Sequence, residues 1–160
     1  MKNQFSEIKL EVEDFLKEFE NDENQKIAYK KYFRGLQIFF TPLIHKPKFM
    51  FIGINPGAGY FNNDGNQVNY VKRLSPMQKT EYVGQQYRLA KETRKLFERA
   101  KIEKIYLQNS VKTNYYFLAT KNTNELTKLL NSLQNYNIEK KSEKWIHKLT
   151  EIIEPEFIIC

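Results

Sequence analysis

The feature that most constrains this chain is a short, fully apolar run, Phe49-Met50-Phe51-Ile52, which lies between Pro47 and Gly53. A run this short without polar alternation is typical of a β-strand that is buried on both faces. The residues that follow, as far as position 76, are rich in Gly, Asn, Asp and Pro, which favour turns. We therefore predict a buried strand followed by a long, ordered loop, and loops of this length usually have a function.

Helix-like and strand-like patterns alternate along the rest of the chain. Apolar residues at helical spacing predict helices over residues 6–19 with Ser6 as N-cap, 23–33 ended by Gly35, 81–100, 122–133 capped by Asn122 or Thr123, and 142–153 stopped by Pro155. Short apolar runs at 102–107 and 115–118 are candidates for the next strand, and another strand begins at 157–159. The alternation predicts an α/β fold, a three-layer α/β/α sandwich with a central, mostly parallel sheet.

Length and composition favour one compact domain. The chain has 160 residues, of which 41% are hydrophobic, and this is enough to bury a core. We expect a single domain over residues 1–160, with N-terminal helices over 1–40 and an α/β core over 41–160. The one cysteine, Cys160, excludes an intrachain disulfide framework and a multi-cysteine metal site. With no apolar leader or membrane-length stretch in the sequence, we expect a cytoplasmic protein.

The charge balance suits a polyanionic partner. Lys and Arg number 26 against 19 Asp and Glu, a formal net charge of +7, and most of the positive excess lies after Lys26. Four cations lie in or after the loops where phosphate contacts are expected: Lys72, Arg73, Lys79 and Lys112. DNA is therefore the expected partner, and the alternative is that these cations only keep the surface solvated.

The segment Gly53-Ile54-Asn55-Pro56-Gly57 has the composition of a ligand-binding loop. In a parallel α/β sheet, ligands bind at the carboxyl ends of the strands, which is where this loop begins. Gly53 and Gly57 carry no side chain to hinder close approach of a ligand, Pro56 fixes one φ angle, and Asn55 offers a neutral amide. The loop suits a flat, neutral, hydrogen-bonding molecule.

The run FMFIGINPG resembles the first conserved motif of uracil-DNA glycosylases, in particular the mismatch-specific and single-strand-selective branches, where a strand ends in Gly-x-Asn-Pro-Gly. The resemblance implies a uracil-DNA glycosylase-like fold that needs no metal or cofactor. It implies that Asn55 holds the hydrolytic water and that the loop backbone at Gly53, Ile54, Pro56 and Gly57 binds the base. The alternative is a turn that only connects a strand to a helix.

A second segment, VKTNYY at residues 111–116, is similar to the strand whose Thr-Asn pair supplies the uracil-reading amide in several glycosylase branches. An Asn side chain can pair with the N3–H and O4 edge of uracil, and it meets the wrong donor and acceptor on cytosine. Asn114 is the first candidate for this reader and Asn109 the second, although an Asn beside a strand can also serve as a cap or Asx turn.

Flipped bases are also clamped by an aromatic ring. Tyr60 and Phe61 follow the motif, and we rank Phe61 first. Core packing is the competing explanation, because the chain holds 10 Tyr and 12 Phe.

The resemblance covers residues 49–160 and is incomplete. Uracil-DNA glycosylases carry a second, His-containing motif, which neither His45 nor His147 matches, so we expect structural roles for both. Two explanations are open: a truncated piece of a longer enzyme, or a shortened relative that binds without cutting. The apolar residues 157–160 would leave a sheet edge poorly covered. This favours either truncation or a partner chain that covers the C-terminal strand.

Three functional hypotheses follow. The first is hydrolysis of the N-glycosidic bond of uracil or a related damaged base in DNA. The second is a catalytically inactive DNA- or base-binding module of the same fold. The third is a nucleotide-binding protein that uses residues 53–59 as an anion cradle, but this segment lacks the Lys-Ser/Thr of a P-loop.

Overall fold

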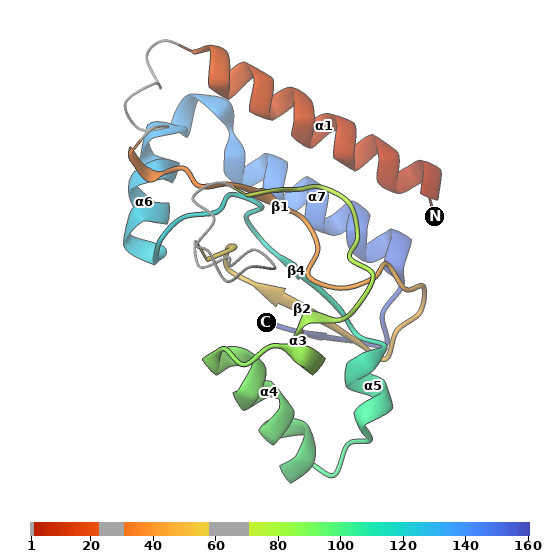
Figure 1. Cartoon of the computed structure of the whole chain (residues 1–160). Coiled ribbons are helices and arrows are strands. Elements are labelled where there is room, and N and C mark those ends of the chain that lie inside the picture. Colours follow the sequence, from red (N-terminus) through yellow and green to blue (C-terminus); the bar gives the residue numbers. More distant parts are fainter. Residues whose placement is uncertain (1, 23–30, 58–70) are drawn as a thin grey trace.

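The computed structural model describes residues 2–22, 31–57 and 71–160, which form a mixed α/β fold (Figure 1). The described helices are α1 (Lys2–Asn21), α3 (Glu81–Gly84), α4 (Arg88–Arg99), α5 (Lys104–Gln108), α6 (Thr123–Ser132), the 3₁₀ helix η2 (Gln134–Tyr136) and α7 (Ile138–Ile153). The described strands are β1 (Gly35–Gln37), β2 (Phe49–Gly53), β3 (Val71–Arg73), β4 (Val111–Asn114) and β5 (Phe157–Ile159). Within these residues, no helix is both long enough and apolar enough to cross a membrane.

The strands pair in parallel, in two small sheets. β2 is the middle strand of the order β4-β2-β5, and β1 pairs with β3. Segment 35–40 also runs beside β4 and the residues that follow it, through hydrogen bonds from Gln37 N to Phe117 O (2.9 Å) and from Phe40 N to Lys112 O (3.1 Å). The parallel pairing agrees with the prediction, whereas the predicted single sheet is divided in two. Residues 35–40 belong with the strands, so the predicted limit of the N-terminal helices at residue 40 is wrong.

Helices pack against both faces of β2. Successive strand residues point to opposite faces, and the buried β2 side chains divide accordingly. Met50 joins a large core with residues of α1, α6 and α7, whereas Phe49 and Phe51 join a smaller cluster with residues of α3, α4 and α5. Figure 1 shows α1 and α7 on one side of the strands and α4 and α5 on the other. The carboxyl end of β2 is thereby held between two helical layers.

Several predicted elements are confirmed, with shifted limits. The helices at 6–19, 122–133 and 142–153 are α1, α6 and α7, and the strands at 49–52 and 157–159 are β2 and β5. Asn122 is the N-cap of α6, because its Oδ1 accepts a hydrogen bond of 2.9 Å from Glu125 N. Ser6 is not an N-cap, since α1 has already begun at Lys2.

Three predictions of local structure are wrong. The helix expected at 81–100 is broken into α3 and α4, and the run at 102–107 is largely the helix α5. The next strand lies between the two apolar runs proposed for it, at Val111–Asn114. Its polar residue Thr113 can be buried because Ile38 O accepts a hydrogen bond of 2.6 Å from Thr113 Oγ1.

The predicted loop at 53–76 contains β3, whose Val71 pairs with Gly35. Gly35 opens β1 with a φ of +107°, and a Cβ there would stand 1.9 Å from Val71 O. Glycine is therefore required at this position for two independent reasons. Of the helix expected at 23–33, residues 31–32 are helical and 23–30 lie outside the described residues.

Candidate functional site

The Gly-x-Asn-Pro-Gly loop leaves the carboxyl end of β2 and continues beside the residues that follow β4. Gly53 O accepts a hydrogen bond from Tyr115 N (2.7 Å), and Ile54 O accepts one from Tyr116 N (2.9 Å). Further along, Pro56 O accepts a hydrogen bond from Thr120 N (3.2 Å). The two segments are thus paired beyond the ends of their strands, and this fixes the course of the described part of the loop.

Asn55 is half-buried, and its amide nitrogen is held by three acceptors. Nδ2 lies 2.9 Å from Thr120 Oγ1, 3.0 Å from Pro56 O and 3.4 Å from Leu118 O. Because carbonyl oxygens only accept hydrogen bonds, the nitrogen must face them. None of the described residues donates a hydrogen bond to Asn55 Oδ1. The side chain therefore offers a fixed acceptor.

Thr120 is a site residue that the sequence reasoning missed. Its hydroxyl donates to Asn122 O (2.8 Å), so a lone pair of Oγ1 is directed to Asn55 Nδ2. The two residues lie 65 positions apart, and no motif in the sequence links them. Only the pairing of the segments after β2 and β4 brings them together.

Asn114 ends β4 directly opposite Gly53 in the β2–β4 register. The side chain is 3% exposed, and none of the described residues accepts a hydrogen bond from its buried Nδ2. A Cβ on Gly53 would stand 2.3 Å from Asn114 Oδ1, so the amide occupies the space that the glycine leaves open. A buried donor without a partner costs about 1–3 kcal/mol, which makes this amide a candidate for pairing with a ligand.

The other candidate reader, Asn109, has a different place in the structure. It is the C-cap of α5, where its backbone N donates to Ile105 O (3.0 Å). It precedes β4 and therefore lies at the amino end of that strand, away from Gly53. The prediction of Asn109 as an alternative reader is wrong for this reason.

Tyr115 and Tyr116 follow Asn114 and form an aromatic pair beside the loop. Their rings meet edge to face with centroids 4.9 Å apart, and both side chains are half-buried. Burial raises the pKa of Tyr115, and the carboxylates of Glu143 and Glu139 raise it further. The aromatic clamp predicted at Tyr60 and Phe61 lies outside the described residues.

The predicted phosphate-binding cations differ in exposure. Lys72 is exposed and Arg73 half-buried, both on β3, and Lys79 is exposed. Lys112 is 6% exposed, and its ammonium lies over the rings of Phe40 and Tyr82. The prediction of a surface phosphate contact is wrong for Lys112, because a strand directs its side chain into the layer of α3 and α4.

The two histidines pair with acids on or next to α7. His45 Nε2 lies 3.9 Å from a carboxylate oxygen of Glu154, and His147 Nδ1 lies 3.4 Å from one of Glu151. Across the described residues, no group of three or more His, Cys, Asp or Glu side chains could hold a metal ion.

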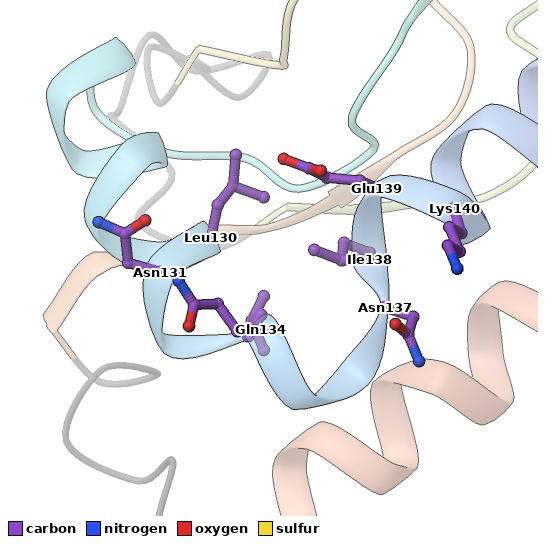
Figure 2. A pocket seen from close by; sticks show the side chains of 8 residues that line it. Leu130, Asn131, Gln134, Asn137, Ile138, Glu139 and Lys140 are labelled. Carbon is purple, nitrogen blue, oxygen red and sulfur yellow. The ribbon is translucent and has the colours of Figure 1, made fainter.

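A surface pocket of about 250 Å³ lies apart from these residues, between α6 and the start of α7 (Figure 2). It is lined by Leu130, Asn131, Leu133, Gln134, Asn137, Ile138, Glu139 and Lys140. None of the predicted site residues that the structure describes lines this pocket, and the candidate site is defined by Gly53, Asn55, Asn114 and Thr120.

Comparison of the chain with family models, with curated proteins and with solved structures found no match.

Proposed function

We propose that this chain has a uracil-DNA glycosylase-like fold and hydrolyses the N-glycosidic bond of uracil, or of a related damaged base, in DNA. One observation carries the proposal: Asn114 ends β4 opposite Gly53, the last residue of β2, and Asn55 follows Gly53 by two residues, so both amides belong to the carboxyl ends of two neighbouring parallel strands. Ligands gather at this edge of a parallel α/β sheet. The helical layers on both faces of β2 are in keeping with a three-layer sandwich.

Asn114 has the chemistry of a base reader. Its buried Nδ2 donor has no partner among the residues that the structure describes, so a ligand that accepts a hydrogen bond there relieves the cost of burial. Uracil presents O4 as an acceptor beside the N3–H donor, which matches the two ends of an amide. Cytosine presents the opposite pattern at both positions, so the same amide discriminates against it.

Asn55 has the chemistry of a water-positioning group. With Nδ2 held by Thr120 Oγ1 and two backbone carbonyls, Oδ1 is a fixed acceptor for a proton of the attacking water. The water oxygen forms a bond to C1′ while the bond from C1′ to N1 breaks and its electron pair leaves with the base. One water proton is released and the base later takes up a proton, so the reaction is a net hydrolysis.

A DNA partner is part of the proposal. The chain has a formal net charge of +7, and Lys72, Arg73 and Lys79 have side chains that reach solvent. Such cations bind phosphates without regard to sequence and make binding sensitive to salt.

The test is incubation of the purified chain with an oligonucleotide that contains a single uracil, followed by detection of alkali-labile abasic sites. We expect abasic sites with the wild-type chain and a loss of about 100-fold or more with Asn55→Ala. Fluorescence anisotropy of the same oligonucleotide at rising salt measures binding separately. Salt-sensitive binding without abasic sites would reject the hydrolase and favour the inactive DNA-binding module.

A further inference from the structure

Lys112 keeps its charged group in a largely aromatic environment within the fold. Its side chain is 6% exposed, and Nζ lies 4.1 Å from the centroid of the Phe40 ring and 4.4 Å from that of Tyr82. Nζ also lies 3.4 Å from the hydroxyl oxygen of Tyr87, the N-cap residue of α4. Ring faces and a hydroxyl together stabilise a cation that is withdrawn from water.

This ammonium lies on the same face of the sheet as the amide of Asn114. Residues two apart on a strand point the same way, and their Cα atoms are about 7 Å apart. In the β2–β4 register Lys112 is opposite Phe51 and Asn114 is opposite Gly53. The rings of Phe51 and Tyr82 meet edge to face at 5.4 Å, which places the Lys112 ammonium on the side of α3 and α4. Lys112 and the candidate reader are therefore two residues apart on one buried strand, with their side chains on the same face of the sheet.

We propose that Lys112 stabilises the negative charge that develops on the departing base. This inference rests on the proposed glycosylase function and deepens it. When the bond from C1′ to N1 breaks, the electron pair spreads from N1 over the carbonyl oxygens of the base. A cation on the same face of the sheet, in a partly desolvated site, lowers the energy of that anion more than that of the neutral, bound base. Lys112 thus acts on the rate of bond cleavage and little on substrate binding.

A residue that stabilises the leaving group can be distinguished by experiment from one that only supports the fold. Loss of a structural support slows the release of all bases by the same factor. Loss of a charge that stabilises the leaving group slows poor leaving groups more than good ones. 5-Fluorouracil is the better leaving group of an otherwise similar pair, because its fluorine withdraws electrons from the ring.

The experiment compares single-turnover release of uracil and 5-fluorouracil from otherwise identical oligonucleotides. The variants are Lys112→Met and Lys112→Gln, which remove the charge, Lys112→Arg, which keeps it, and Lys104→Met as a control that removes an exposed cation on α5. Thermal unfolding of each variant identifies any that does not fold, and two neutral variants allow the comparison to be made if one of them is lost.

We expect the neutral variants to release uracil about tenfold more slowly than the wild type does. Their rate of 5-fluorouracil release should fall by a smaller factor. Their affinity for the oligonucleotide should equal that of the wild type. Lys112→Arg should restore most of the wild-type rate of uracil release, and Lys104→Met should slow neither base more than the other. Equal losses with both bases, or no loss, would overturn the role of Lys112 and leave the glycosylase proposal standing. Release of neither base by the wild-type chain would overturn both proposals.

Discussion

Gly53 and Asn114 face each other across the β2–β4 pair so closely that a Cβ on Gly53 would stand 2.3 Å from Asn114 Oδ1. The first glycine of the Gly-x-Asn-Pro-Gly loop is thus required by the amide of a residue on another strand. Gly53 has no side chain, and this makes room for the polar side chain of Asn114.

Gly53→Ala should displace the Asn114 amide. The contact is shorter than real Cβ contacts allow, so either Asn114 adopts another rotamer or the strands shift. We expect a loss of about 1–3 kcal/mol in the free energy of unfolding, measured by urea denaturation, together with weaker uracil binding. Gly84→Ala is the matched control, because a Cβ at Gly84 meets no atom within 4 Å. Equal stability of the two variants would contradict the account of Gly53.

Thr120→Val should release the amide of Asn55. Valine keeps the shape of threonine but removes the oxygen that lies 2.9 Å from Asn55 Nδ2. We expect the free energy of unfolding to fall by about 1 kcal/mol and uracil release to fall by about tenfold or more. Thr120→Ser keeps the hydroxyl and should retain most of the activity. If single-turnover rates for the Val and Ser variants fall by the same factor, the hydroxyl has no role in positioning Asn55.

Glu11 should make the stability of the fold depend on pH. Its carboxylate accepts hydrogen bonds from Lys148 Nζ (2.7 Å), Trp145 Nε1 (3.1 Å) and Lys144 Nζ (3.2 Å), which join α1 to α7. Burial raises the pKa of Glu11, but the hydrogen bonds and charges of Lys148 and Lys144 outweigh it and lower the pKa below its usual value of 4.5.

Because folding lowers this pKa, the stabilisation is present above pH 4.5 and is lost as the pH falls through the folded-state value. Glu11→Gln should therefore lose about 1 kcal/mol of unfolding free energy at pH 7, and its difference from the wild type should shrink as the solution is acidified. Urea denaturation at a series of pH values measures both. Asp14→Asn, which breaks an exposed pair with Lys17, is the control and should change little. A constant difference at all pH values would contradict this role of Glu11.

Regular apolar patterns predicted the helices α1, α6 and α7 and the strands β2 and β5 from the sequence alone. β4 was harder to predict, because its buried residues Lys112, Thr113 and Asn114 are polar, and the burial of Lys112 and Thr113 depends on partners elsewhere in the chain. Similarly, β3 is a short strand in a turn-rich segment and exists because Val71 pairs with Gly35. Long-range pairing of this kind leaves no local signal.

The candidate site could likewise be predicted from the sequence only in part. The local motif identified Asn55, and a second short segment identified Asn114, but neither indicated that their strands are neighbours. Thr120 could not be found, since its contact with Asn55 spans 65 positions. The sequence predicts a phosphate contact for Lys112 from its position in or after a loop, whereas the rings of Phe40 and Tyr82 over its ammonium show that it is buried.

The most direct test of the central claim is to follow the side-chain amide signal of Asn114 by NMR while free uracil is added to the ¹⁵N-labelled chain, with Asn114→Ala used to assign that signal. We predict a saturable shift of the Asn114 signal with uracil and none with cytosine at the same concentration, because uracil presents its O4 acceptor to the buried Nδ2 and its N3–H donor to Oδ1, whereas cytosine presents a donor and an acceptor at these two positions. An Asn114 signal that uracil leaves unmoved, or that cytosine moves equally, would contradict the proposed base site.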